Sequence, residues 1–138
     1  MRRLKRRPVQ NIFPILRYQD ARAAIQWLKD AFGFVELFSV PESGPYVRHA
    51  QLQVGTSIIM VGSVRPEDGL SSPLSSHAPT QALCVHVSDV YALFQRASAA
   101  SAVLISPPAV SDVGFLEFHV RDPEGHPWTF TSFLRAQR

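Results

Sequence analysis

The two halves of this sequence repeat one another at a nearly constant offset, and that repeat limits the possible folds more than any other feature. Asp20 and Asp89, 69 residues apart, each stand directly before a segment with apolar residues on one helical face. Gly55 and Gly125, 70 residues apart, each precede a short apolar stretch. Because order, helix pattern and spacing agree, the chain is predicted to contain two copies of one β-α-β-β-β unit.

Each unit contains one helix whose ends are marked by the residue types there. In the first unit, Asp20 is a suitable N-cap and Gly33 a suitable C-terminal stop. Between them the apolar residues fall on one helical face, at Ala21, Ala24, Ile25, Leu28 and Phe32. The second unit has the same kind of face at Val90, Leu93, Phe94, Ala97 and Ala100. Each helix is therefore predicted to pack one face on a sheet.

Short apolar segments bounded by turn residues predict four strands in each unit. In the first unit they are residues 12–18, 34–40, 46–54 and 57–64, followed by a Pro/Ser/Gly-rich loop over 65–80. In the second they are 81–87, a brief strand 103–105 before two prolines, 114–121 and 127–134. The chain is thus predicted to be one domain, 1–138, with a basic tail 1–10, module one 11–64, the loop 65–80 and module two 81–134.

The basic character of the chain lies in its first residues. Five positive charges stand among the first seven residues, and subtracting them from the formal net charge of +3 leaves −2 for the remainder. No aromatic residue alternates with these arginines, and no basic stripe continues beyond them. We therefore expect a solvated tail rather than an arm that binds nucleic acid or anionic lipid.

Cysteine content and hydropathy indicate a cytoplasmic protein without a membrane partner. The single cysteine, Cys84, excludes an intramolecular disulfide, which is typical of a reducing compartment. No apolar run approaches the roughly 20 residues of a membrane helix. Prolines and polar residues also interrupt the stretch after the tail, so a signal peptide is not expected.

Four stretches of the sequence together resemble a known family. FPILRYQDARAAIQWLKDAFGF, VGTSIIMVGS, ALCVHVSDVYALFQRA and RDPEGHPWTF occur in this order within residues 11–134. With them the chain resembles the glyoxalase/bleomycin resistance protein/dioxygenase superfamily, the vicinal oxygen chelate proteins, and within it the glyoxalase-like subgroup. The resemblance implies an α+β fold of two tandem β-α-β-β-β modules whose curved mixed sheets enclose a cavity. It also implies a homodimer.

The resemblance also implies where a metal would bind. Enzymes of this superfamily hold a divalent metal with His and Glu side chains from the first and last strand of each module. Carried onto this chain, the four positions are occupied by Phe13, Ile59, Ala82 and Thr129. Only Thr129 carries an oxygen, and a lone hydroxyl is a poor metal ligand. We therefore expect neither the usual metal site nor another cofactor.

Strand alternation predicts which side chains face the cavity. Trp128 and Phe130 are expected under the helices, together with Ile58 and Met60 from the first module. The residues of opposite parity are then expected on the cavity side, namely Phe13, Ile15, Arg17, Ile59, Val61, Ala82, Cys84, His86, Thr129 and Thr131. From the third strands, Val47, His49, Gln51, Phe115, Glu117 and His119 are expected to join them.

His49 and His119 are predicted to be equivalent in the two modules and to approach one another across the cavity. A histidine beside Glu117 could recognise a substrate or transfer a proton. A displaced metal site of His49, Glu117 and His119 is a further alternative. Both histidines could instead be polar residues on wet strands.

The remaining candidates have weaker signals. Arg17 could pair with an anionic ligand or form a structural ion pair. His86 is expected at the rim, and His77 and His126 in solvent. Cys84 has no recognisable partner base and is expected to be a small apolar filler.

Three functions remain open at this point. The first is a metal-free protein that binds a small organic or drug-like molecule between its modules, through Phe13, Arg17, His49, Gln51, Ile59, Phe115, Glu117, His119 and Thr129. The second is a lyase, isomerase or dioxygenase-type enzyme with a non-standard or absent metal site. The third is a scaffold dimer without a ligand. The missing ligands favour the first and third, and no catalytic residue is assigned.

Overall fold

The computed structural model describes residues 10–76 and 78–132, and the predicted basic tail lies almost wholly outside these ranges. Module one contains β1 (Ile15–Tyr18), α1 (Ala21–Phe32), β2 (Val35–Val40), β3 (His49–Val54) and β4 (Ser57–Ser63). The connection to module two holds the short 3-10 helices η2 (Pro66–Asp68) and η3 (Pro73–Ser75). Module two contains β5 (Leu83–His86), α2 (Val90–Ala99), β6 (Val103–Val110), β7 (Leu116–Arg121) and β8 (Pro127–Ser132).

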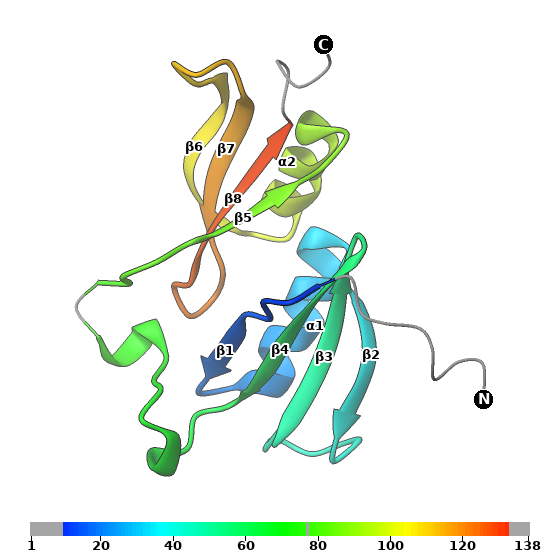
Figure 1. Ribbon diagram of the computed structural model, residues 1–138, viewed down its shortest axis with the longest axis vertical. Coiled ribbons are helices and arrows are strands. Elements are labelled where there is room, and N and C mark those ends of the chain that lie inside the picture. Colours follow the sequence, from blue (N-terminus) through cyan, green and yellow to red (C-terminus); the bar gives the residue numbers. More distant parts are fainter. Residues whose placement is uncertain (1–9, 77, 133–138) are drawn as a thin grey trace.

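Each module forms its own four-stranded mixed sheet, and the two sheets lie one above the other along the molecule (Figure 1). The strand orders are β1-β4-β3-β2 and β5-β8-β7-β6. In each sheet the first and last strands of the module pair in parallel, and the other pairs are antiparallel. The predicted α+β fold of two tandem β-α-β-β-β units is confirmed. No helix among the described residues is long and apolar enough to cross a membrane.

Both helices begin where their sequence signals predict. The Asp20 and Asp89 side chains accept hydrogen bonds from the backbone N–H of Ala23 and Ala92, at 3.1 and 3.0 Å. Gly33 ends α1 in the left-handed conformation, with φ of 77°, and its N–H reaches carbonyls of the last turn. The buried face of α1 is the predicted apolar face.

The second module differs from prediction at its edge strand. A brief strand was predicted to end before Pro107, but β6 runs from Val103 to Val110 and includes both prolines. It does so because β6 is an edge strand, where a missing N–H can face solvent. Its register against β7 shifts on either side of Ser106. The predicted loop 65–80 likewise contains two 3-10 turns.

One apolar core joins the two modules. The Phe32 ring, at the end of α1, lies 5.4 Å from the Trp128 ring and 4.7 Å from the Phe130 ring, measured between centroids. Phe34 lies 5.5 Å from Trp128. All four side chains are buried, so aromatic rings from both modules pack against one another in a common core.

Polar contacts between the helices support the same interface. Arg96 of α2 donates from Nε to the Asp30 carbonyl at 2.8 Å and from Nη2 to the Lys29 carbonyl at 3.2 Å. Both carbonyls belong to the last turn of α1, and the Lys29 carbonyl also accepts from the Gly33 N–H at 3.0 Å. Trp27 Nε1 donates to the Ala100 carbonyl at the end of α2, at 3.1 Å. Each helix thus donates a side-chain hydrogen bond to a carbonyl at the C-terminal end of the other.

The turn between β7 and β8 anchors module two on module one through two buried carboxylates. Asp122 accepts from the Tyr18 hydroxyl at 2.5 Å and from Trp128 Nε1 at 3.1 Å. Glu124 accepts from the backbone N–H groups of Gln19 and Asp20 at 2.7 and 2.8 Å. Burial, and then the charge of Asp122, raises the pKa of Tyr18 well above its ordinary value, so its hydroxyl remains a donor.

Two further contacts of this turn were not predicted. The Ser72 hydroxyl donates to Glu124 at 2.6 Å, which ties the connecting segment to the same carboxylate. His126 was expected in solvent, but it is half-buried, with Nε2 2.9 Å from the Arg17 carbonyl oxygen. The prediction failed because β1 of module one, far away in sequence, covers this turn.

We expect Glu124→Gln to lower the free energy of unfolding by about 2 kcal/mol, because a charged acceptor is replaced by an amide whose NH2 opposes a backbone N–H. Urea denaturation monitored by circular dichroism measures this loss. Glu67→Gln, in the exposed turn η2, is the matched control and should change little. Equal effects of the two substitutions would contradict the anchoring role of Glu124.

Candidate functional site

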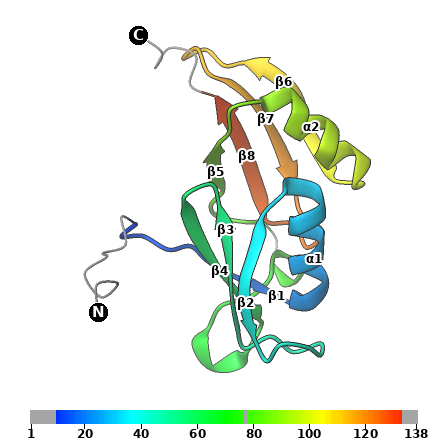
Figure 2. The ribbon, with the colours of Figure 1, turned by 90° about the vertical axis from the view of Figure 1, so that its right-hand side faces the viewer.

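Each sheet has one face covered by its helix and one open face. Figure 2 shows α1 and α2 on the same side of the two sheets. We call the sides away from the helices open face one, on the sheet of module one, and open face two, on the sheet of module two. Within the described residues, the modules contact each other through the helices, the aromatic core and the β7–β8 turn, and the sheets do not pack their open faces together.

Polar side chains form a grid on open face two. Thr129 on β8 pairs with Cys84 on β5 and with His119 on β7. Thr131, two residues on, pairs with His86 and with Glu117 in the same way. Since paired residues share a face, all six lie together, and Trp128 and Phe130 point to the core. The predicted orientation of this sheet is confirmed.

Three of these groups are in contact with one another. His119 Nδ1 lies 2.8 Å from Thr129 Oγ1, and His119 Nε2 lies 3.4 Å from a Glu117 oxygen. If His119 is neutral with its proton on Nε2, the Nε2–H points to Glu117 and Nδ1 accepts from the Thr129 hydroxyl. The carboxylate thus orients the imidazole, and the imidazole orients the hydroxyl. Such a chain can recognise a polar group or hold a proton.

Cys84 and Thr131 differ in their surroundings on the same face. Cys84 was expected to be an apolar filler but is exposed. Burial of part of its surface, and then the negative charge of Glu117, raises the pKa of the Cys84 thiol. Thr131 is 1% exposed, and its hydroxyl has no hydrogen-bond partner among the described residues.

The predicted orientation of the last strand of module one is wrong. Ile59 and Val61 were expected in the cavity, but they are 4% and 0% exposed and lie in the core. Ile58 and Met60 occupy the open face instead, because Met60 pairs with Ile15 and Gln51.

The cause is a difference of one residue between two turns. In module one Val54 pairs with Ser57, which leaves two residues in the turn. In module two the Asp122 N–H bonds to the His126 carbonyl, which leaves three. A shift of one residue exchanges the two faces of a strand.

The same shift changes the equivalence of the histidines. Thr129 pairs with His119, whereas its structural counterpart Met60 pairs with Gln51. His119 therefore corresponds to Gln51, and His49 corresponds to Glu117. The predicted equivalence of His49 and His119 rested on a constant offset that the turn does not preserve.

Open face one is mostly apolar. Its half-exposed residues are Ile15, Val35, Phe38 and Val40, with exposed fractions between 45% and 55%. His49 and Gln51 stand among them, with His49 Nε2 3.2 Å from Gln51 Nε2 and the imidazole 5.7 Å from the Phe38 ring. Val47, also expected on this face, is instead fully buried.

The structure does not bring His49 and His119 together. They lie in different sheets, where His49 contacts Gln51 and His119 contacts Thr129. Within residues 10–76 and 78–132, no three His, Cys, Asp or Glu side chains come close enough to hold a metal ion. The alternative metal site of His49, Glu117 and His119 is therefore not formed. The four positions implied by the resemblance do not fit a metal either, since the one oxygen among them, of Thr129, contacts His119.

The remaining predicted site residues lie near the ends of the strands. Phe13 and Phe115 are half-buried and precede β1 and β7. Ile59 borders a cavity of about 500 Å³ between the modules, which Gln10, Ile12 and Cys84 also line. His86 is exposed. Arg17 is 8% exposed and forms an ion pair with Asp68, a residue that sequence reasoning did not select.

We expect Cys84 to react slowly with iodoacetamide at pH 8, because its raised pKa keeps the thiolate fraction below that of an unperturbed cysteine. The rate should rise as pH increases toward that pKa. Glu117→Gln should increase the rate about twofold, since it removes the smaller, charge-based part of the shift. Glu42→Gln, in an exposed loop, is the control, and mass spectrometry measures the alkylated fraction. A faster reaction of wild type than of free cysteine would contradict the expected environment.

Comparison with known families gives a match over most of the chain. Residues 11–130 match the family described as Glyoxalase/Bleomycin resistance protein/Dioxygenase superfamily. An uncharacterized protein of Mycobacterium bovis is 33% identical over 125 residues, which cover 88% of this chain and 82% of that protein.

Solved structures show the same fold. TioX from Micromonospora sp. ML1 is 34% identical with a TM-score of 0.73, over 89% of this chain and 95% of that one. A glyoxalase-related enzyme from Fulvimarina pelagi, 23% identical with a TM-score of 0.70 over 90% and 88% of the two chains, shares the fold. The family match covers most of the chain and agrees with the two β-α-β-β-β modules. This chain therefore belongs to the glyoxalase/bleomycin resistance protein/dioxygenase superfamily.

Proposed function

We propose that this chain binds a small, largely apolar organic molecule on open face one, without a resident metal, and that a second copy of the chain covers the ligand. The observation that carries the proposal is the group of half-exposed apolar side chains around His49 and Gln51. A surface of this kind is typical of ligand sites, which combine apolar walls with a few polar anchors.

The energetic argument rests on the exposed apolar area. Phe38 and its neighbours on open face one are about half exposed, and covering them yields about 25 cal/mol per Å² of apolar surface. A planar aromatic molecule could lie against Phe38 and Val40. His49 and Gln51, already within contact distance of each other, could bond to its polar edge.

A second copy is the partner that best covers both open faces. Open face one is mostly apolar and open face two mostly polar, so the two faces are unlike. In a two-fold dimer, open face one of each chain can oppose open face two of the other, which closes two identical cavities. The ligand would then lie between His49 of one chain and the Glu117–His119 pair of the other. Contiguous exposed apolar surface is commonly an interaction site in a soluble protein.

An enzymatic function is the second candidate, and one observation favours it. Glu117, His119 and Thr129 form a chain of carboxylate, imidazole and hydroxyl. An imidazole oriented in this way can act as a general base toward a ligand in the cavity. Turnover of a bound ligand that is lost in His119→Gln, with binding retained, would favour this function over binding alone.

The binding function is tested with a neutral planar probe, 1-naphthamide. We expect wild type to elute as a dimer, at twice its 15.4 kDa chain mass, and to bind the probe in a fluorescence titration. Phe38→Asp should dissociate the dimer and weaken binding at least about tenfold, since it buries a charge in the apolar face.

Val113→Asp is the matched control for this experiment. Val113 is 57% exposed and lies between β6 and β7, away from open face one. The Val113→Asp variant should leave both the mass of the eluted dimer and the affinity for the probe unchanged. A monomeric wild type that binds no probe would contradict the proposal.

We also expect the purified protein to contain much less than one equivalent of zinc, nickel, manganese or iron per chain, because the implied ligand positions lack suitable donors. Elemental analysis after purification without added metal or chelator measures this content. One full equivalent that survives dialysis would contradict a metal-free site.

A further inference from the structure

Open face one carries a buried arginine in addition to its apolar side chains. Arg17 lies on β1, is 8% exposed, and pairs in the sheet with Gly62 of β4. A Cβ atom at Gly62 would lie 2.7 Å from Arg17 Nη1, so the guanidinium lies across the glycine. The missing side chain at position 62 leaves the room that this cation occupies.

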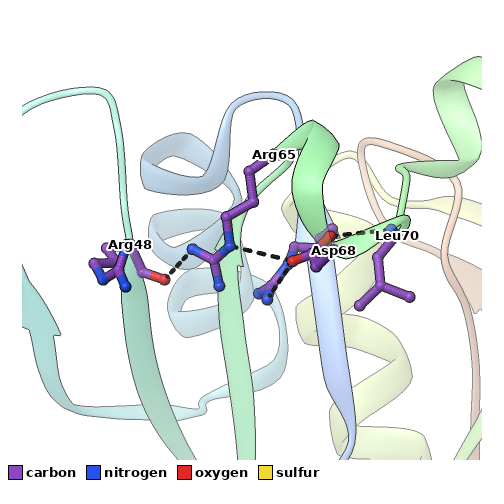
Figure 3. A network of polar contacts seen from close by, with 5 residues as sticks. Arg48, Arg65, Asp68 and Leu70 are labelled. Carbon is purple, nitrogen blue, oxygen red and sulfur yellow. Dashed lines mark hydrogen bonds and ion pairs between the residues drawn. The ribbon is translucent and has the colours of Figure 1, made fainter.

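The present partner of Arg17 is a carboxylate from the connecting segment. Arg17 donates to one oxygen of Asp68 from Nε at 3.0 Å and from Nη2 at 2.9 Å. Arg65 Nε donates to the same oxygen at 3.1 Å. Figure 3 shows this network in front of the strands, with α1 behind them. Two guanidinium groups therefore share one carboxylate, and the group keeps a net positive charge.

The Asp68 carboxylate has the features of a replaceable partner. Its side chain is 26% exposed, and it belongs to the three-residue helix η2 rather than to the sheet. Its other oxygen accepts from the Leu70 N–H at 3.0 Å, a contact within its own turn. An ion pair with an exposed member contributes little to stability. A buried arginine, by contrast, needs some anion at all times.

Space for another anion adjoins Arg17. A cavity of about 300 Å³ is lined by Arg17, Leu70, Ser71, Gln81 and His126. Among the hydrogen bonds described for residues 10–76 and 78–132, Arg17 uses Nε and Nη2, and none involves Nη1. A guanidinium can bind a carboxylate with two parallel N–H groups, a geometry stronger than two bonds to a single oxygen.

We propose that Arg17 anchors a carboxylate group of the ligand, and that Asp68 occupies this position until the ligand replaces it. The inference rests on the proposed binding function and adds a chemical class, a planar apolar molecule with one carboxylate. Arg65 then remains with Asp68 as the segment moves aside. One anion is exchanged for another, so Arg17 stays neutralised throughout.

The test compares two probes of nearly equal shape, 1-naphthoate and 1-naphthamide, at one fixed salt concentration. Wild type should bind the carboxylate more tightly than the amide. Arg17→Gln should weaken naphthoate binding about tenfold to a hundredfold, which is the affinity that hydrogen bonds to a charged group typically contribute. It should change naphthamide binding less than about twofold.

The decisive variant is Asp68→Asn, which keeps Arg17 and removes the competing charge. It should tighten naphthoate binding about threefold to fivefold, because breaking an ion pair with an exposed member costs little free energy. Naphthamide binding should not change. Glu67→Gln removes a neighbouring charge on the same turn and should change neither affinity. If the ion pair is purely structural, losing either partner should lower the stability of the protein and should not increase the affinity for either probe.

The outcomes separate the two proposals. Equal affinities for the two probes, or unchanged or weaker naphthoate binding in Asp68→Asn, would overturn the anchoring role and leave the binding function in place. Binding of neither probe would overturn both. If Arg17→Gln fails to fold, Arg17→Lys retains the charge without the planar fork and should still lose most of the preference for the carboxylate.

Discussion

The turn between β7 and β8 buries two carboxylates that need hydrogen-bond donors. The position of module two relative to module one depends on the donors that module one provides. Asp122 and Glu124 are 2% and 7% exposed, and a buried charge without partners would cost several kcal/mol. Their donors come from the turn itself, from β8, from the end of β1 and from Ser72. Module two can therefore take only the position in which Tyr18 and the start of α1 meet this turn. The shared aromatic core around Phe32 then closes between the modules.

That constraint has consequences for the open faces. With both helices on one side, the two sheets present their other faces without mutual contact in the part of the chain that the structure describes. The faces have different chemistry, because open face one carries Phe38 and Met60 where open face two carries polar residues such as Thr129. The shared fold does not decide function, so the proposed ligand binding is argued from the residues on these two faces. The two faces also differ in charge, since open face two carries Glu117 and open face one carries Arg17.

Local signals were sufficient for most of the fold. The caps of both helices, their apolar faces and the repeat depend on residues a few positions apart, so the sequence alone predicted α1, α2 and the two modules. The resemblance to the superfamily, now confirmed, rested on four stretches in order. The orientation of β8 was also predicted correctly, because Trp128 and Phe130 alternate with two threonines.

The site depended on contacts that no local pattern contains. A turn one residue shorter in module one exchanged the faces of β4, so Met60 rather than Ile59 reached the open face, and Gln51 rather than His49 matched His119. Arg17 contacts Asp68, 51 positions away in sequence, and His126 contacts the Arg17 carbonyl of β1, 109 positions away. The sequence by itself determined which elements form and that they form twice, because helix and strand periodicity are local. Only the tertiary structure decided which side chains meet on the open faces, because strand register and buried charge pairs are fixed by the packing of distant segments.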